Sequence, residues 1–203
     1  VAAITAAVLA FSAAAGVVEA ADPLTKVWER HPGSNSGDAA RAVATDAAAN
    51  AIVAGDTLGS IGKLNAGRED AFLIKYSPTG TVLWRRQLGT QNIDRPQAVA
   101  TDGSGNIAVV GYTSGWLFGR NTGSWDGYVV SYAPDGARRW AHQLGTAEFD
   151  SMDGVVALAA GDVFIGGTLG SDCVLIRYDR NGRETWRRVV RSGRTGISGI
   201  VRG

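Results

Sequence analysis

The stretch Asp126-Gly-Tyr-Val-Val-Ser-Tyr-Ala-Pro-Asp-Gly-Ala-Arg-Arg-Trp140 is repeated twice in this chain. The first copy is Asp70-Ala-Phe-Leu-Ile-Lys-Tyr-Ser-Pro-Thr-Gly-Thr-Val-Leu-Trp84, and the last is Asp172-Cys-Val-Leu-Ile-Arg-Tyr-Asp-Arg-Asn-Gly-Arg-Glu-Thr-Trp186. Trp28, Trp84 and Trp140 are spaced by 56 residues, and Trp186 follows after 46. Periods of about 20–50 residues are typical of solenoids, propellers and arrays. Residues required in every copy serve packing first, so the repeat predicts an architecture rather than a site.

Each repeat contains four strand-like pieces separated by turn residues. In the second repeat these pieces are 97–101, 106–112, 127–132 and 138–144, and the last two are joined by Ala133-Pro-Asp-Gly136, a strong turn sequence. The third piece is apolar on both faces, which indicates cover on both sides of its sheet. Four-stranded antiparallel blades stacked around an axis provide that cover. The sequence therefore predicts an all-β β-propeller.

The repeat places three blades at 42–90, 98–146 and 154–193 of a propeller that spans 21–203. Trp28 lies one 56-residue repeat before Trp84, which predicts an outer strand at 24–31. Residues 196–203 are expected to begin a further blade. Three blades with partial ones fall short of the four to eight of closed propellers. We expect a fragment of a larger ring of six to eight blades.

The third repeat is ten residues shorter than the others. Gly111 lies 15 positions before Asp126, whereas Gly166, taken as its counterpart, lies six before Asp172. This alignment removes nine residues from the middle hairpin and one between Trp140 and Gly166. Deletions confined to loops leave the strands intact.

Residues 1–20 are interpreted as a signal peptide that lacks its start. Residues 1–18 carry no charge, and Val18-Glu19-Ala20 would allow cleavage before Ala21. A membrane anchor is the alternative, because about 18 uncharged residues nearly span a bilayer. The signal interpretation predicts a secreted, periplasmic or cell-surface protein with no stable membrane insertion after cleavage.

The composition argues against some classes of partner and of metal site. The 20 Lys and Arg and 19 Asp and Glu residues give a formal charge of +1, so no overall field attracts nucleic acid. Cys173 is the only cysteine, which excludes an intrachain disulfide and a Cys-rich metal site. It lies in a strand-like run and is expected to be buried.

Several motifs occur in a fixed order: Ala-Val-Ala-Thr-Asp at 98–102, Gly-Asn-Ile-Ala-Val-Val-Gly-Tyr-Thr at 105–113, the turn at 133–136, and Trp-Ala-His-Gln-Leu-Gly-Thr at 140–146. This combination resembles the bacterial SBBP β-propeller repeat family, best over 98–146 and closely over 42–90. Residues 154–193 depart from this pattern, because Asp179-Arg180 replaces the pairs Ser77-Pro78 and Ala133-Pro134 of the other repeats. The resemblance implies a secreted or surface propeller module of a larger protein, without catalytic residues.

The repeated polar residues have structural explanations. Asp102 and Asn106 could suggest a calcium loop, but Asp46-Ala-Ala-Ala-Asn50 takes the same place without the middle oxygen ligand, so we interpret them as turn formers. Asp70, Asp126 and Asp172 are expected to accept structural hydrogen bonds, for instance from a neighbouring blade's backbone. His31 and His142 show no triad arrangement and are expected at the surface.

Residues that do not repeat are the better candidates for function. Trp116, Phe118 and Trp125 correspond to Ser60, Gly62 and Glu69 in the first blade, so the architecture does not require the aromatic rings. With the nearby Arg120 they could form a protein or carbohydrate contact, because Trp and Arg are favoured at binding hot spots. The alternative is a loop that packs over its own hairpin or the next blade.

Arginines gather near each outer strand: Arg85, Arg86, Arg138, Arg139, Arg187, Arg188, Arg191 and Arg194. They fit a solvated edge that resists aggregation, or else a polyanion-binding surface. The sequence predicts a non-catalytic scaffold module that contacts an unknown protein or glycan, with no cofactor and no metal. The alternative is a part of a quinoprotein-like propeller enzyme whose active site lies outside these residues.

Overall fold

The chain forms three four-stranded antiparallel sheets, as the repeat predicts. The computed structural model describes residues 26–31 and 33–192, and all regular structure in that part is β. The first sheet has the order β1-β2-β3-β4, the second β5-β6-β7-β8 and the third β9-β10-β11-β12. The strands are β1 (Asp38–Thr45), β2 (Ala51–Thr57), β3 (Asp70–Tyr76), β4 (Val82–Leu88), β5 (Asp94–Thr101), β6 (Ile107–Thr113), β7 (Asp126–Tyr132), β8 (Arg138–Leu144), β9 (Ser151–Ala157), β10 (Val163–Leu169), β11 (Asp172–Tyr178) and β12 (Glu184–Ser192).

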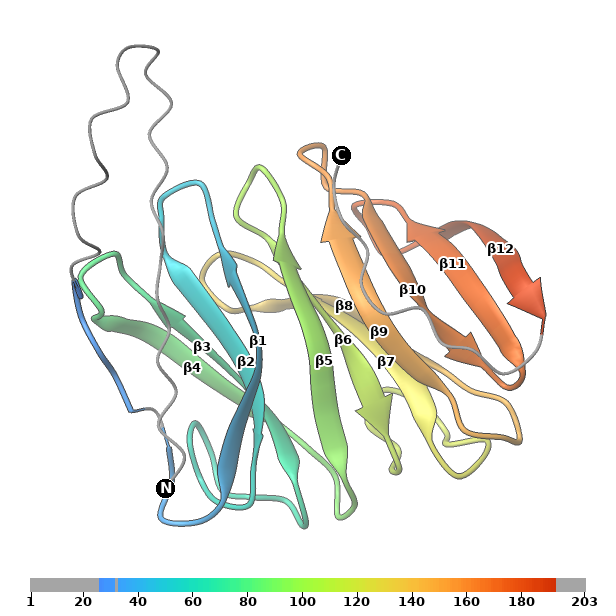
Figure 1. Cartoon of the computed structure of the whole chain (residues 1–203), viewed down its shortest axis with the longest axis horizontal. Coiled ribbons are helices and arrows are strands. Elements are labelled where there is room, and N and C mark those ends of the chain that lie inside the picture. Colours follow the sequence, from blue (N-terminus) through green and yellow to red (C-terminus); the bar gives the residue numbers. More distant parts are fainter. Residues whose placement is uncertain (1–25, 32, 193–203) are drawn as a thin grey trace.

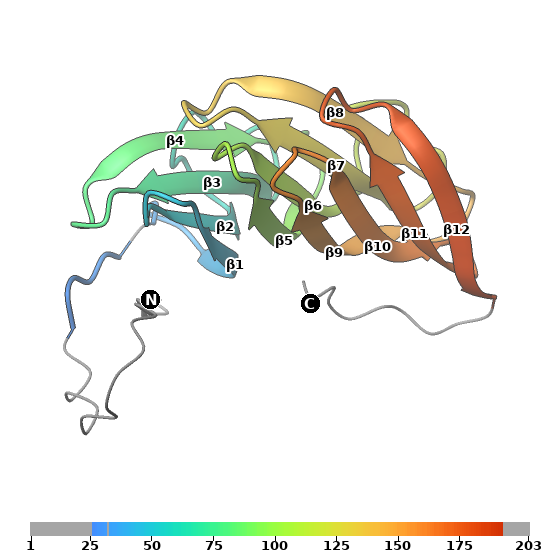
Figure 2. The same cartoon turned by 90° about the horizontal axis from the view of Figure 1, so that it is seen from above.

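The three sheets stand side by side like blades around an axis (Figure 1). The first strands of successive blades, β1, β5 and β9, contact one another. Seen from above, they line the concave side of an arc, while β4, β8 and β12 follow its convex side (Figure 2). The arc formed by these blades is open. This is the predicted propeller architecture, with first strands inside and fourth strands outside.

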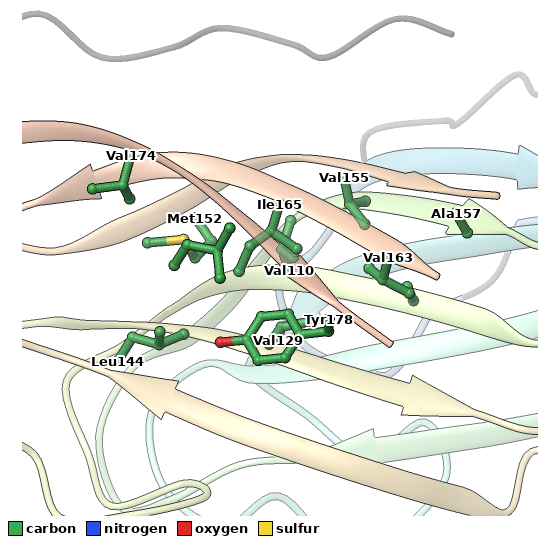
Figure 3. Packing of buried hydrophobic residues seen from close by; sticks show 12 residues of the cluster. Val110, Val129, Leu144, Met152, Val155, Ala157, Val163, Ile165, Val174 and Tyr178 are labelled. Atoms are coloured by element: carbon green, nitrogen blue, oxygen red, sulfur yellow. The ribbon is translucent and has the colours of Figure 1, made fainter. Parts of the chain in front are cut away.

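Apolar side chains fill the space between neighbouring blades. Ile52 and Leu73 of the first blade pack with Tyr128 and Val130 of the second. The opposite face of the second blade, including Val129, packs on the third, where Ile165 is fully buried (Figure 3). Because β7 sends alternate side chains into both interfaces, it has apolar residues on both faces, as its sequence indicates.

The inner strands begin earlier than predicted. β1 starts at Asp38 instead of residue 42, and β5 starts at Asp94 instead of 97. A β-bulge at Arg41, repeated at Gln97 and Asp153, interrupts the regular pairing of each inner strand. The bulge adds one unpaired residue and shifts the side-chain alternation. The alternating pattern therefore identifies only the part of the strand after the bulge.

The alignment of the third repeat through Gly166 is wrong; the structural counterpart of Gly55 and Gly111 is Gly167. At each of the three positions an added Cβ would lie within 2.1 Å of an inner-strand carbonyl oxygen. Only glycine fits there, since this is closer than any non-bonded contact allows. When Gly167 is taken as the counterpart, all ten missing residues fall in the loop between the second and third strands of the blade. This middle loop has twelve residues in the first two blades, 58–69 and 114–125, but two in the third, 170–171.

Residues 26–31 have no strand assignment but make the contact of an outer strand. Trp28 Nε1 donates to the Pro78 carbonyl at 2.9 Å, and Arg30 Nε donates to that of Gly80 at 2.9 Å. Trp84 Nε1 contacts the carbonyl of Pro134, the equivalent residue one blade further, in the same way. The phase of Trp28 thus marks a blade contact.

Two of the predicted segments, the signal peptide at 1–20 and the start of a blade at 196–203, lie outside the described residues. Within the described part, the search for a helix long and apolar enough to cross a membrane found none.

Candidate functional site

A set of aspartates that the sequence analysis missed anchors each loop leading into an inner strand. Asp94 accepts hydrogen bonds from Thr90 N at 2.6 Å and from Thr113 Oγ1 at 2.5 Å. Burial raises the pKa of Asp94, although the hydrogen bonds from both threonines act in the opposite direction. Asp38 and Asp150 repeat the arrangement with their own loops. Their 56-residue spacing was the available signal.

A second set fixes the middle loop of the first two blades. Asp126 accepts a hydrogen bond from Gln143 Nε2 at 2.9 Å, and Asp70 accepts one from Gln87 Nε2 at 2.9 Å. These partners lie in the same blade, so the suggested bond to a neighbouring blade is wrong for both. In the third blade Val189 takes the place of the glutamine, where the loop is reduced to two residues. The glutamine and the long loop therefore occur together.

We call this arrangement the glutamine clamp, and it holds the loop through its backbone. Gln143 Oε1 accepts from the amides of Leu117, Phe118 and Gly119 at 3.0, 3.0 and 3.2 Å. Gln143 Nε2 also donates to the Gly115 carbonyl at 3.0 Å. Gln87 makes the corresponding bonds to the loop of the first blade. The clamp uses no side chain of the loop, which leaves those side chains free to differ between blades.

The turn at 102–106 is held by its own atoms. Asp102 Oδ1 accepts from the amides of Ser104 and Asn106, both at 2.8 Å, and Oδ2 accepts from Asn106 Nδ2 at 2.7 Å. These bonds are those of an Asx turn. In the described part of the chain, no group of three His, Cys, Asp or Glu side chains has an arrangement suited to a metal ion.

His142 is partly buried and connects two blades, whereas the sequence analysis expected a polar surface residue. Its ring stacks on Tyr178 of the third blade with centroids 5.0 Å apart, and Nε2 lies 2.6 Å from the Gly182 carbonyl oxygen. Arg86 occupies the same position in the previous interface, where Nε donates to the Gly136 carbonyl at 2.7 Å. Both side chains connect an outer strand to the next blade's turn. His31 is exposed and lies 3.2 Å from Glu29.

The loop at 114–125 and the outer strand β8 enclose a shallow groove of about 570 Å³. Trp116 is 70% exposed at its rim, and Phe118 packs edge-on against Tyr128 below. The guanidinium of Arg138 lies 5.7 Å from the centre of the Phe118 ring. We call this the outer groove, and its lining residues are Trp116, Leu117, Phe118, Gly119, Arg138, Arg139, Trp140 and Ala141.

Three of the four predicted contact residues lie at or beside the outer groove. Trp116 and Phe118 line it, and Arg120 is exposed with its guanidinium 6.0 Å from the Trp116 ring centre. Trp125 is not among the lining residues. Its ring packs against Tyr112 at 5.2 Å and against Phe149 at 6.1 Å, beside the start of the third blade. This half-buried ring follows the alternative prediction, a loop residue packed on the next blade.

The second wall of the groove, Arg138 and Arg139, was placed by the sequence analysis in a general arginine-rich edge. Their counterparts in the first blade are Val82 and Leu83. The bulge at residue 139 recurs in the other two blades, and Arg138 lies over the Phe118 ring of the loop. Comparing the two repeats at these positions would have revealed the difference, but only the fold shows that loop and strand share one groove.

Arg86 and the groove residue Arg139 also bind the next blade. Arg86 also donates from Nη2 to the Asp135 carbonyl at 3.2 Å, and Arg139 Nη2 donates to that of Arg180 at 2.9 Å. The edge is therefore partly an interface between blades. The side chain of Arg191 and the whole of Arg194 lie outside the described residues.

Comparison with known family models gave a match within the repeat region. Residues 83–119 match the family model of the SBBP beta-propeller repeat. This segment is similar to an SBBP repeat. It extends from the outer strand of the first blade to the outer groove, and it confirms the family resemblance of the sequence motifs. The comparison with curated proteins gave no significant match.

Solved structures show more distant similarity. One is a protein of unknown function from Bacteroides caccae, with 18% identity and a TM-score of 0.47 over 81% of this chain and 50% of that one. Another is described as a candidate gluconolactonase, with 17% identity and a TM-score of 0.41 over 74% and 48%. The chain spans about half the length of these two proteins.

Proposed function

We propose that these blades form a non-catalytic, exported scaffold module that contacts a protein or a glycan through the outer groove. The observation that carries the proposal is a coordinated difference between two blades with the same scaffold. The first blade has Ser60, Gly62, Val82 and Leu83 where the second has Trp116, Phe118, Arg138 and Arg139. Both loops are held by the same clamp, so holding the loop backbone does not require these aromatic and cationic groups.

The repeated carboxylates support a scaffold role. Asp94 and Asp126 accept hydrogen bonds from the loops that they organise. A general acid or base must instead reach a substrate proton. The side chains that differ between blades are aromatic rings and guanidinium groups, which are typical of binding hot spots.

The first blade supplies the residues for the test. A variant with Trp116→Ser, Phe118→Gly, Arg138→Val and Arg139→Leu carries the first blade's side chains on the second. We expect unchanged far-UV circular dichroism and loss of binding to the glycan or peptide probes that the native protein retains on defined arrays. Equal binding by both proteins to every probe, or no binding by the native protein, would overturn the proposal.

Export has a separate test. Expression of the gene with its own N-terminus in a bacterial host should yield mature protein that begins at Ala21, outside the cytoplasm, as determined by N-terminal sequencing of each cell fraction. The uncharged segment before Glu19 and the small residues at 18 and 20 support this expectation. A product that keeps residues 1–20 and remains in the membrane fraction would support the anchor alternative.

A further inference from the structure

The outer groove has positive charge without a compensating carboxylate. Elsewhere in the described chain Arg41, Arg95 and Arg177 pair with Asp56, Glu69 and Asp162 at N–O distances of 2.5 Å. Arg138 and Arg139 have no such partner among the described residues, and all the lining side chains are apolar or cationic. Arg139 Nη2 donates to the Arg180 carbonyl, which carries no net charge, so the positive charge of the groove is still available to an anionic ligand.

The neighbouring outer strands extend this charge along the convex side. The described side chains of β4, β8 and β12 include six arginines and one acidic residue, Glu184, which pairs with Arg187 at 2.9 Å. Within β4, Arg85 is exposed, while Arg86 binds the turn of the second blade. An extended anion that leaves the groove would meet further cations on either side. A long polymer fits this distribution better than a small ion does.

Trp116 provides a flat apolar surface at the rim of the groove. Its 70% exposure is unusual for so large an apolar side chain, and Arg120 lies near the ring. A sugar ring can stack its C–H face on an indole while a carboxylate on the same sugar reaches a guanidinium. Arginine binds carboxylates through two parallel hydrogen bonds, which adds geometric selectivity to the charge.

The groove is formed before any ligand arrives. Three backbone amides of its loop are bonded to Gln143, and Phe118 is fixed between Tyr128 and Arg138. Preformed sites lose less conformational entropy on binding. The groove is also shallow and open at its rim, which suits a chain passing across it rather than an enclosed small molecule.

We infer that the outer groove binds an acidic saccharide, a polymer with uronic acid units, with one sugar on Trp116 and its carboxylate at Arg138 or Arg139. This inference rests on the proposed contact function and names its ligand class. An acidic peptide is the main competitor, since β8 is an outer strand. The exposed indole beside two cations favours the sugar.

Oligogalacturonate and its methyl ester are suitable probes, because they share a sugar backbone and differ in charge. Isothermal titration calorimetry on the whole chain should detect the acid form and no more than weak binding of the ester. Arg138→Gln with Arg139→Gln should lower the affinity at least about tenfold, as expected for lost charge-assisted hydrogen bonds. The matched control, Lys63→Gln with Arg68→Gln, removes the same charge from exposed positions of the first blade and should change the affinity less than twofold.

The outcomes separate the ligand class from the contact function. Equal affinity for acid and ester, with both lost in Trp116→Ser, would overturn the acidic class and keep the groove as a glycan site. Binding of acidic peptides but neither saccharide would overturn the saccharide and keep a protein contact. An equal loss of affinity in the control pair would show that net charge, not the groove, is responsible, and would overturn the inference. Failure of every probe would overturn both proposals.

Discussion

Gln87 and Gln143 each hold one loop by bonding to its backbone and to a buried aspartate. In the second blade the amide group satisfies three N–H donors, one carbonyl and the carboxylate of Asp126. A buried polar group that loses its partner costs about 1–3 kcal/mol. The Gln143 side chain therefore contributes both to the stability of the second blade and to the shape of its loop at 114–125.

Replacing the two glutamines separately should distinguish these effects. We expect Gln143→Ala to lower the free energy of unfolding by about 1–3 kcal/mol and to weaken binding in the outer groove. Gln87→Ala should cost a similar amount and leave that binding unchanged, because it frees the loop of the first blade. Urea unfolding and titration with the ligand of the native protein measure the two quantities. Equal weakening of binding by both variants would contradict the assigned role of Gln143.

The bulge on each inner strand depends on the glycine that faces it. A Cβ on Gly111 would lie 2.0 Å from the Arg95 carbonyl oxygen, whereas one on Gly119 would lie 3.6 Å from Gln143 Cβ. The first contact requires displacement of the backbone, and the second is an ordinary contact. An added methyl group should therefore disturb the pairing of β5 with β6 at Gly111, whereas the loop should tolerate one at Gly119.

Gly111→Ala should lower the free energy of unfolding by about 2–4 kcal/mol, as overpacking against fixed backbone does. Gly119→Ala is the matched control and should change it by less than about 1 kcal/mol. Thermal unfolding followed by circular dichroism measures both variants. A small effect at Gly111 would mean that β5 can move away without loss of the bulge.

The strands show how far sequence alone could lead. Turn residues and repeat spacing predicted the observed bounds of β8, and those of the other strands of that blade within a few residues, because local chemistry decides turns. The first part of β5 was missed since the bulge at Gln97 breaks the alternation. Gly166 was mistaken for Gly167 because adjacent glycines are indistinguishable without the carbonyl that faces them.

The sequence allowed us to predict only one of the two walls of the outer groove. The rings at 116 and 118 stood out as departures from the repeat, and the structure places both in the groove. Arg138 resembled the other edge arginines, because nothing in its neighbourhood along the chain shows that it faces a loop twenty residues earlier. Trp125 resembled Trp116 in sequence but packs on Phe149 of the following blade. Contacts across the fold decide these assignments.

At the level of the whole molecule, buried tyrosines make the blades sensitive to alkali. Burial raises the pKa of Tyr132 to about 12, and it also raises the pKa values of Tyr76, Tyr128 and Tyr178. An unfolded tyrosine titrates near about 10. Above that pH the unfolded chain binds fewer protons than the native one, so stability decreases as the pH rises.

The free energy of unfolding should therefore be insensitive to these groups below about pH 10 and should fall between about pH 10 and 12. Tyr132→Phe keeps the ring and removes one titrating group, which should make the decline shallower by up to about 2 kcal/mol at pH 12. Urea midpoints measured from pH 8 to 11.5 test this. A steeper decline in the variant would contradict the assignment.

The stacking of blades depends on one tryptophan at each junction. Trp84 donates to the Pro134 carbonyl at 2.9 Å and covers Gly136, and Trp28 and Trp140 cover the equivalent Gly80 and Gly182. In repeat proteins, stability is the sum of the units and of the interfaces between neighbours. Each of these indoles therefore belongs to an interface, and its loss should weaken the coupling between two blades.

Trp186 separates the two contributions, because none of the described residues supplies a following turn; its ring packs on Phe164 of its own blade at 5.7 Å. We expect Trp84→Ala to cost about 2–3 kcal/mol and Trp186→Ala less than half as much. Trp84→Ala should also broaden the thermal transition, because the first blade then unfolds before the others. Calorimetry measures both quantities. Equal losses with sharp transitions would show that these tryptophans stabilise individual blades, and that the coupling resides in the apolar layers between the sheets.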